Sequence, residues 1–562
     1  MISLTAKTDK KQDYLLFGSG YEKLFLMNGC IICVAVIDSK FKTKMWQRRF
    51  PYNQSRVSKR LVIVALIALS LIAVLSLGVY VIAQQMRSRL VVVNGATITV
   101  KSGGEFQTAL DKAKPGDTIV LEAGATYKGS FTLPNKTGAE FITIRSSAND
   151  SQLPAQNQRI DPAKHASVLP KLVSSSTDPV IKTAAGAHHY RFIGIEFGPT
   201  QGGYYNIIRI GEAEEKSVED LPHHIEFDRV YIHGSPTDGQ RRGIAANGRH
   251  IRIINSHISD IKRKGEESAA IGVWGSDGAL EIVNNYIEAA GIGVLLGGAY
   301  NPNLNLVVAD VVVRDNHFNK PLEWRDEGWV VKNIFEIKSG KRVKVTNNLM
   351  TNNWGGGQGG TAILFTVRED SGPNAVIEDV EFTDNLVRSS GGAVSVYGDE
   401  VKGGRRLTIR NNVFDDIDGT KWEGAGQFLL TNGWDNLVVE NNTVIQTGNI
   451  TKAYGKPVTN FIFRNNIVFN NDYGFHGDSR APGQDSVDFY FPKSLIDNNA
   501  IIGGDGRLKS RNMYPASILE LKFINPKVGD YRPQPNSPLK KKGANGMDIG
   551  ANLDPMKVGK NG

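Results

Sequence analysis

Cysteine is nearly absent from this sequence. Its two cysteines, Cys30 and Cys33, both lie near the beginning, so everything after residue 33 must fold without disulfides. The pair has C-x-x-C spacing, but neither a second pair nor a repeating strand–helix pattern accompanies it. Metal or redox chemistry is therefore a weak interpretation of these two residues.

A charge of one sign is also lacking over most of the chain. Residues 1–60 hold 12 Lys and Arg against 4 Asp and Glu, which gives +8 of the net charge of +9 of all 562 residues. The remaining 502 residues therefore carry a net charge of about +1. This distribution gives no reason to expect nucleic acid as a partner.

The run LVIVALIALSLIAVLSLGVYVIA at residues 61–83 contains no charged residue. It is long enough to cross a bilayer as a helix and longer than the core of a signal peptide. Because basic residues crowd the segment before it, the positive-inside rule predicts a single-pass membrane anchor. Residues 1–60 would then be cytoplasmic and the rest periplasmic or extracellular. A cleaved signal is the alternative, and residues 1–44 need not be native, because Met45 opens a sensible anchor start.

Asn-Asn and Asp-Asn pairs, in contrast, are frequent inside apolar, strand-like runs. The second residue of the pair recurs every 24–37 residues, a spacing typical of solenoids. Every copy has an apolar residue three positions before it and another two positions after it. The eight copies are Asn285, Asn316, Asn348, Asn385, Asn412, Asn442, Asn466 and Asn499.

The alternation of apolar and polar residues on each side of the pair predicts two short strands joined by a sharp corner. Asn tolerates the left-handed backbone conformation that such a corner needs. Where coils stack about 4.8 Å apart, each Asn amide can bond to its equivalent in the next coil. The sequence therefore predicts Asn-corner coils over about residues 185–502, with an internal ladder of Asn side chains.

A stack of coils has two open ends that need covering. Residues 97–134 predict a capping segment that begins with an amphipathic helix, with Phe106, Ala109, Leu110 and Ala113 on its apolar face. Residues 503–555 are rich in turn residues and are expected to close the other end. We therefore expect one domain over residues 88–555.

The entry Pro115-Gly116-Asp117-Thr118-Ile119, the Asn corners and the closing Asp548-Ile549-Gly550-Ala551 resemble the right-handed parallel β-helix, or pectin-lyase-like, superfamily. The resemblance covers about residues 97–555. It implies an all-β solenoid with an N-terminal capping helix that, where catalytic, acts mostly on polysaccharides. Other stretches look like bacterial exported β-helix proteins of uncharacterised function, and fold alone does not give function.

Lys338 in FEIKSGKRV and Arg368 in ILFTVRED are the candidate catalytic residues. They follow Asn316 and Asn348 by 22 and 20 residues, so we expect them at nearly the same lateral position of adjacent coils. A uronate lyase needs a base and a positive charge beside the substrate carboxylate. The arrangement resembles the alginate lyase and chondroitinase B type, which implies Lys338 as base and Arg368 as its assistant. The chain departs from that pattern at Glu369, where the family tends to have His-Gly.

Carboxylates near Lys338 suggest a calcium site, because Ca²⁺ prefers oxygen ligands. The candidate ligands are Glu336, Asp326 and Glu323. The alternative is a loop of solvated charges.

Substrate-binding residues are expected nearby. An indole can stack on the apolar face of a sugar ring, and paired Arg can hold a carboxylate or sulfate. The candidates are Trp324, Trp329, Trp354, Arg241 and Arg242. The alternatives are small apolar clusters within the loops for the Trp, and bridges between neighbouring coils for the Arg.

The sequence therefore favours a membrane-anchored, extracytoplasmic, monomeric protein that binds an acidic polysaccharide, and it leaves open whether the polysaccharide is cleaved by β-elimination. The rival interpretation is a non-catalytic β-helix for glycan binding or adhesion, or an envelope scaffold. A hydrolase built on Asp415, Asp416 and Asp418 is less favoured, because the partner residues that it needs are not evident.

Overall fold

The computed structural model describes residues 23–27, 30–34 and 95–559, and the chain divides into one unit up to Val92 and a second from Val93. In the first unit, β1 (Lys23–Met27) and β2 (Cys30–Val34) pair antiparallel. The predicted membrane anchor at residues 61–83 lies outside the described residues. Among the helices that are described, none has the length and apolar character to span a bilayer.

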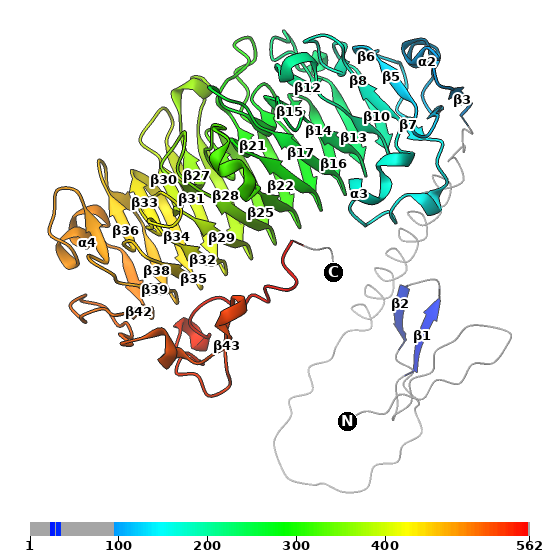
Figure 1. Cartoon of the computed structure of the whole chain (residues 1–562). Coiled ribbons are helices and arrows are strands. Elements are labelled where there is room, and N and C mark those ends of the chain that lie inside the picture. The colour runs from blue at the N-terminus through cyan, green and yellow to red at the C-terminus, as the bar shows by residue number, and fades with distance from the viewer. Residues whose placement is uncertain (1–22, 28–29, 35–94, 560–562) are drawn as a thin grey trace, which may run out of the picture. The chain divides into compact units, whose positions relative to one another are not determined.

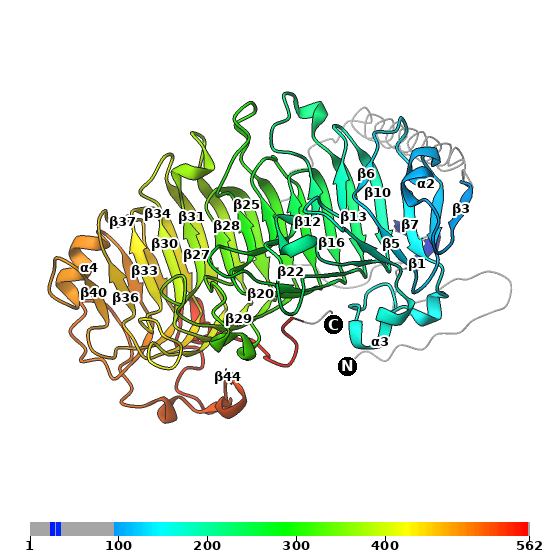
Figure 2. The ribbon, with the colours of Figure 1, turned by 45° about the horizontal axis from the view of Figure 1, so that its top comes forward.

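The second unit is a stack of coils, and three parallel sheets run along the stack (Figures 1 and 2). Sheet 1 contains β3 (Thr97–Val100), β4 (Thr118–Leu121), β7 (Ile142–Ser146), β10 (His188–Ile193), β13 (His223–Asp228), β16 (Arg249–Ile254), β19 (Leu280–Val283), β22 (Ala309–Arg314), β25 (Gly340–Thr346), β28 (Ile377–Thr383), β31 (Gly404–Arg410), β34 (Trp434–Glu440), β37 (Val458–Thr459), β38 (Ile462–Arg464) and β41 (Leu495–Asp497).

The chain then turns a corner into sheet 2 and a further one into sheet 3. Sheet 2 contains β5 (Thr126–Lys128), β8 (Lys171–Val173), β11 (Glu196–Phe197), β14 (Tyr231–His233), β17 (His257–Ile261), β20 (Tyr286–Ala289), β23 (His317–Asn319), β26 (Leu349–Asn353), β29 (Leu386–Ser390), β32 (Val413–Ile417), β35 (Thr443–Gln446), β39 (Ile467–Phe469) and β42 (Ala500–Ile502). Sheet 3 contains β6 (Phe131–Leu133), β9 (Ile181–Thr183), β12 (Asn206–Ile210), β15 (Arg242–Ala246), β18 (Ala269–Val273), β21 (Ile292–Leu296), β24 (Phe335–Ile337), β27 (Thr361–Thr366), β30 (Gly392–Tyr397), β33 (Leu429–Asn432), β36 (Thr451–Ala453) and β40 (Phe475–Gly477).

One apolar core fills the interior of the stack from Val100 to Ile501. Because equivalent positions of successive coils lie directly above one another, like side chains form columns. The rings of Phe192 and Phe227, for example, stack in parallel with their centroids 5.3 Å apart. The alternation in the sequence thus translates into columns of buried Ile, Val and Phe.

The predicted Asn ladder is confirmed at the corner between sheets 1 and 2. Each Asn side-chain amide donates to the side-chain oxygen of the Asn one coil further on, at 3.0–3.1 Å, and all eight are fully buried. The ladder ends at Asn512, which the repeat pattern does not reveal, and Ser256 donates its backbone N–H to Asn285 at the other end. The left-handed residue of each corner is the first of the pair, such as Asn284 at φ 56°.

These first residues form an outer row that holds segments from both ends of the unit. The Asn255 and Asn284 side chains donate to the backbone oxygens of Gln156 and Asn157, just before α3 (Pro162–His165). At the other end, Asn441 donates to the backbone oxygen of Asp548. Other first residues of the corner pairs also bond to the final segment: Asn498 to Lys542, Asn465 to Ala544, Asn411 to Asn552 and Asn347 to Gly559. Residues 542–559 therefore run back along the corner, from its last coils toward earlier ones.

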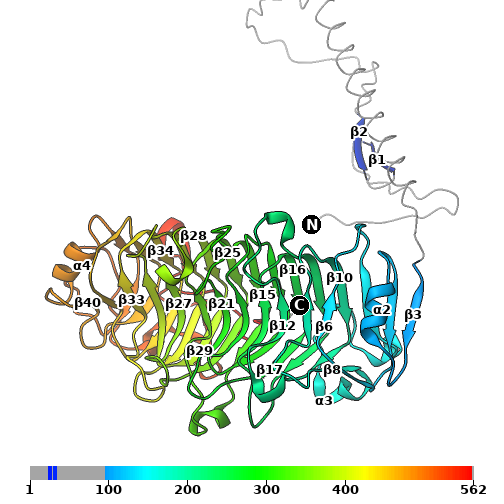
Figure 3. The ribbon, with the colours of Figure 1, turned by 90° about the horizontal axis from the view of Figure 1, so that it is seen from above.

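Short helices lie at opposite ends of the stack, α2 (Phe106–Lys112) and α4 (Gln484–Tyr490) (Figure 3). The four residues expected on the apolar face of the first helix, Phe106, Ala109, Leu110 and Ala113, are buried. The predicted closing segment corresponds in part to β43 (Phe523–Asn525) and β44 (Asp530–Pro533), which pair antiparallel. The return path of residues 542–559 along the Asn corner was not predicted.

We predict that Asn385→Ala lowers the free energy of unfolding by about 3 kcal/mol, because it leaves the buried backbone N–H of Asn348 without its partner and removes the bonds that the Asn385 amide donates to Asn412 and Val345. Chemical denaturation followed by circular dichroism measures the loss. Asn157→Ala is the control, since that side chain is exposed. Equal stability of the two variants would contradict a stabilising role of the ladder.

Candidate functional site

A line of half-buried aromatic and cationic side chains runs past the C-terminal ends of the strands of sheet 3. The strand register puts Trp274 directly after β18, Lys338 directly after β24, Tyr397 at the end of β30 and Tyr454 directly after β36. Arg368 follows β27 and joins this line, because its backbone N–H donates to the Lys338 oxygen at 3.3 Å. We call these five residues the end row; it runs parallel to the axis of the stack.

Lys338 and Arg368 therefore occupy adjacent coils at nearly the same lateral position, as their spacing predicts. Each is paired with a carboxylate: Lys338 Nζ lies 3.0 Å from Asp370 Oδ2, and Arg368 Nη1 lies 2.9 Å from Glu400 Oε1. The Arg368 guanidinium also lies over the Tyr397 ring, 4.7 Å from its centroid. The Arg368 side chain retains 42% of its surface, whereas Lys338 retains 16%.

The charge state of Lys338 bears on its chemistry. Burial alone would lower its pKa, but the nearby carboxylates of Glu336 and Asp370 outweigh burial and hold the pKa above its ordinary value. A general base must be neutral before it can accept a proton. In this arrangement Lys338 is a cation at neutral pH, which suits binding of an anion better than proton abstraction.

Among the residues that the structure describes, the three candidate calcium ligands do not form a group whose ligand atoms all lie within 4.8 Å of one another. Glu336 lies on β24 and is only 2% exposed; burial raises the pKa of its carboxyl group, and Asn333 Nδ2 donates to it at 2.7 Å. Glu323 and Asp326 instead lie exposed on a 3-10 turn, Leu322–Asp326. Calcium remains a prediction without an assigned ligand set.

The expected row of stacking tryptophans is not available in this structure. Trp324, Trp329 and Trp354 are buried, with 3–8% of their surface exposed, and they pack with Trp422 in a small cluster outside the main core. Lys262 Nζ lies over two of these rings, at 4.6 and 4.9 Å. These three indoles therefore fit the alternative interpretation, in which tryptophans form a small apolar cluster within the projecting loops.

Arg241 and Arg242 lie at the start of β15, close to aromatic rings. Arg241 pairs with Glu266 at 3.1 Å, and the Arg242 guanidinium lies 4.9 Å from the Trp274 ring centroid. Burial lowers the pKa of Arg242. Arg242 therefore contacts the first aromatic residue of the end row, whereas β18 and β21 separate its strand from β24, which Lys338 follows.

Two features were missed at the sequence level. The first is a set of accessible tyrosines, Tyr204, Tyr205 and Tyr300, which are 36–55% exposed. The second is a group of histidines at the N-terminal ends of neighbouring strands of sheet 1, β10 and β13 among them. The paired His188-His189 and His223-His224 recur one coil apart and form two stacks, and His250 extends one of them. The doubled HH in HHYRF and HHIEF was the available signal.

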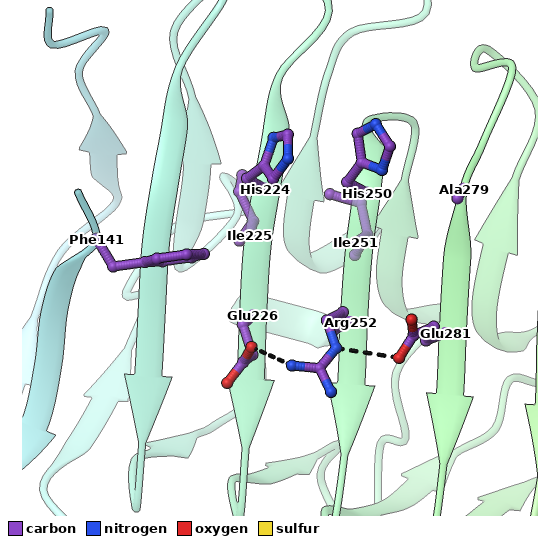
Figure 4. Close-up of a pocket in the computed structure, with 9 residues that line it drawn as sticks. All are labelled: Phe141, His224, Ile225, Glu226, His250, Ile251, Arg252, Ala279 and Glu281. Atoms are coloured by element: carbon purple, nitrogen blue, oxygen red, sulfur yellow. Dashed lines mark hydrogen bonds and ion pairs between the residues drawn. The ribbon is translucent and has the colours of Figure 1, made fainter. Parts of the chain in front are cut away.

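A pocket of about 200 Å³ lies beside these histidines on the outer face of sheet 1 (Figure 4). His224 and His250 lie at one end of it, and Phe141 flanks it. Farther along the strands from the histidines, Arg252 bridges Glu226 and Glu281 at 2.6 and 3.0 Å. Burial, and to a smaller extent repulsion between neighbouring imidazoles, lowers the pKa of His224 and lowers that of His223 to about 4.

His257 and His317 share one row of sheet 2, with Tyr286 between them. The ring centroids along this row lie 4.7 and 5.1 Å apart. Burial lowers the pKa of both histidines to about 4. Within the described residues, neither belongs to a group of three potential metal ligands.

Comparison with known proteins supports the fold. Residues 268–456 match a family model described as "Right handed beta helix region". Together with the three parallel sheets, this match establishes a right-handed parallel β-helix. No curated protein matches the sequence significantly.

Solved structures with related architecture have varied activities. A PL6 family alginate lyase, AlyGC, is 17% identical with a TM-score of 0.49, over 83% of this chain and 58% of the lyase. A GH136 lacto-N-biosidase from Eubacterium ramulus is 14% identical (TM-score 0.37; 77% of this chain, 70% of the other). PfbA, a surface adhesin of Streptococcus pneumoniae, is 13% identical (TM-score 0.31; 58% and 80%). Similarities this low do not assign an activity.

We predict that stability falls as the pH drops from 6.5 to 4. His257 and His317 titrate near 4 when folded and near 6.5 when unfolded, so the unfolded state binds more protons in this window. Urea denaturation at several pH values measures the slope. A His257→Gln, His317→Gln variant should have a shallower slope; an unchanged slope would contradict the assignment.

Proposed function

We propose that the β-helix binds an acidic polysaccharide along the end row of sheet 3. The supporting observation is the placement of Trp274, Lys338, Arg368, Tyr397 and Tyr454 along one line parallel to the stack axis. Aromatic rings that are half exposed offer apolar faces to sugar rings, and the cations offer partners for carboxylates or sulfates. The regular repeat of the coils, about 4.8 Å, suits an extended polymer.

The backbone beside Lys338 supports access to its ammonium group. Gly297 and Gly298 occupy the preceding coil at φ +89° and +83°, a region that favours glycine. A Cβ at Gly298 would lie 3.4 Å from Lys338 Nζ. Glycine at position 298 thus omits a methyl group that would contact the Lys338 side chain.

Binding is favoured over cleavage because the two cations are held by carboxylates. Asp370 helps to keep Lys338 charged, and Glu400 orients the Arg368 guanidinium. A bound uronate carboxylate would compete with these acids for the same donors. Such exchange gives affinity for an anion without requiring a neutral lysine.

Arg368→Ala is expected to weaken binding to polyuronates or sulfated glycans about tenfold, equivalent to about 1.4 kcal/mol, because a charge-assisted contact is lost. Affinity electrophoresis in gels containing each glycan measures the change. The affinity of the wild-type chain should also fall with added salt.

Arg410→Ala on sheet 1 is the matched control. Its side chain is 50% exposed and pairs with Glu440, much as Arg368 is 42% exposed and pairs with Glu400. The control should bind like the wild type. If both variants bind equally well, the end row is not the binding surface.

Cleavage by β-elimination is the second candidate function, favoured by the adjacency of Lys338 and Arg368. We expect no unsaturated uronate from the polyuronate panel at pH 7, with or without calcium, because Lys338 is protonated there. Ultraviolet absorbance follows the product. A signal that is lost in Lys338→Ala would instead establish a lyase; if Lys338 is its base, the rate should rise with pH above neutrality.

The site is proposed to function outside the cytoplasm, with residues 61–83 as a single-pass anchor. This part of the proposal is supported by the uncharged apolar run and the basic residues before it. Digestion of intact cells with an external protease tests it. Loss of the β-helix from intact cells would agree with exposure at the cell surface, whereas protection even after the outer permeability barrier is opened would contradict it.

A further inference from the structure

The two pairs of neighbouring histidines on sheet 1 share an unusual backbone geometry. Consecutive residues of a regular strand point to opposite faces. His189 and His224, however, have left-handed φ values of 57° and 53°, which break the alternation. Both rings of each pair therefore lie on one side: His188 Nδ1 is 2.7 Å from His189 Nδ1, and His223 Nδ1 is 2.7 Å from His224 Nδ1.

Stacking of the coils then brings the two pairs together. The His188 and His223 rings are parallel within 5°, with their centroids 4.7 Å apart, and the His189 and His224 rings are parallel within 6° at 4.6 Å. The result is a two-by-two array of imidazoles, each half-buried. Within the part of the chain that the structure describes, His188, His189 and His223 are the one group of three side chains whose ligand atoms all lie within 4.8 Å of one another.

We propose that His188, His189 and His223 bind a divalent transition-metal ion, with Zn²⁺ as the reference ion. Imidazole nitrogen is the donor that Zn²⁺, Ni²⁺ and Cu²⁺ share, whereas Ca²⁺ and Mg²⁺ prefer oxygen. To form Zn–N bonds of about 2.0–2.1 Å to one ion, the parallel rings of His188 and His223 would tilt out of their stack. Three histidine ligands would leave the fourth tetrahedral position open, as in catalytic rather than structural zinc sites.

A metal ion would replace the contact between the Nδ1 atoms of one pair. In that contact one nitrogen carries a proton and the other accepts it. The protonated Nδ1 frees its lone pair when its proton moves to Nε2, so both imidazoles remain neutral and no net proton is released. In the next coil, Arg249 lies opposite His223 in the strand register. Its guanidinium is paired with Asp277 at 3.0 Å, which reduces its repulsion of an incoming metal ion.

The same position in later coils lacks imidazoles. The left-handed residues equivalent to His189, His224 and His250 become Asp310, Arg342 and Asp379 further along sheet 1. Those residues form ion pairs between coils instead, for example Arg342 Nε with Asp310 at 2.7 Å. The fold therefore does not require histidine at this position, and the five histidines at its N-terminal end are a local feature.

The test uses the untagged full-length chain, freed of metal with a chelator and titrated with ZnCl₂ by calorimetry. We expect one tight site per chain and an increase in thermal stability with Zn²⁺. The variant His188→Asn, His223→Asn should bind at least about 100-fold more weakly. The variant His257→Gln, His317→Gln removes two stacked histidines of sheet 2 and should bind like the wild type.

A second measurement keeps the test independent of how well the variants fold. One equivalent of Cu²⁺ added to the metal-free wild-type chain should give an electron paramagnetic resonance spectrum with splitting from several imidazole nitrogens. Absence of this splitting, absence of Zn²⁺ binding, or equal affinity in wild type and the His188→Asn, His223→Asn variant would overturn the proposal. Equal loss in both double variants would do the same, because it would place the metal elsewhere.

Discussion

The stacking of each coil on the one before is the constraint on which the structure depends. Hydrogen bonds between parallel strands can be satisfied along the whole stack only if every coil turns its corner at the same place. The Asn ladder enforces this: each buried amide bonds to the next Asn, and also to a backbone oxygen, as Asn385 does with Val345. Since buried amides without partners are costly, a coil that turned one residue early would lose several bonds together.

Because the corner between sheets 1 and 2 is fixed, variation in coil length falls elsewhere. The step between ladder residues ranges from 24 to 37 residues, and the extra residues form loops beyond the ladder. The Leu322–Asp326 turn and the buried tryptophan cluster belong to such loops. The two residues of each corner pair also have different roles. The second residue forms hydrogen bonds within the core, whereas the first, left-handed residue bonds to the returning C-terminal segment, as Asn441 and Asn465 do.

The repeating parts of the structure could be predicted from the sequence because they have a period. Apolar flanks such as Ile282 and Ile287 specify inward-facing positions, and the pair between them specifies the corner. The same reasoning puts Lys338 and Arg368 on adjacent coils. The path of residues 542–559, and Asn512 as the last ladder member, have no repeat to reveal them.

Side-chain environment was less predictable than strand position. Trp324, Trp329 and Trp354 lie in loops without a period, so nothing in the sequence distinguishes a buried indole from an exposed one. The end row can be identified only from the strand register, because its members follow their Asn corners by different numbers of residues. The histidine array likewise depends on two left-handed residues, His189 and His224, whose conformation puts neighbouring rings on one side.

The two proposed sites use the same scaffold in opposite electrostatic ways. On sheet 3, carboxylates surround Lys338 and raise its pKa, so the side chain stays charged and is suited to an anionic ligand. On sheet 1, partial burial and mutual repulsion lower the pKa of His223, so the imidazole stays neutral. Each environment includes a neighbour one coil away, Asp370 for Lys338 and His188 for His223. A solenoid can therefore set the charge state of a side chain through the residue at the equivalent position of the next coil, without changing the backbone.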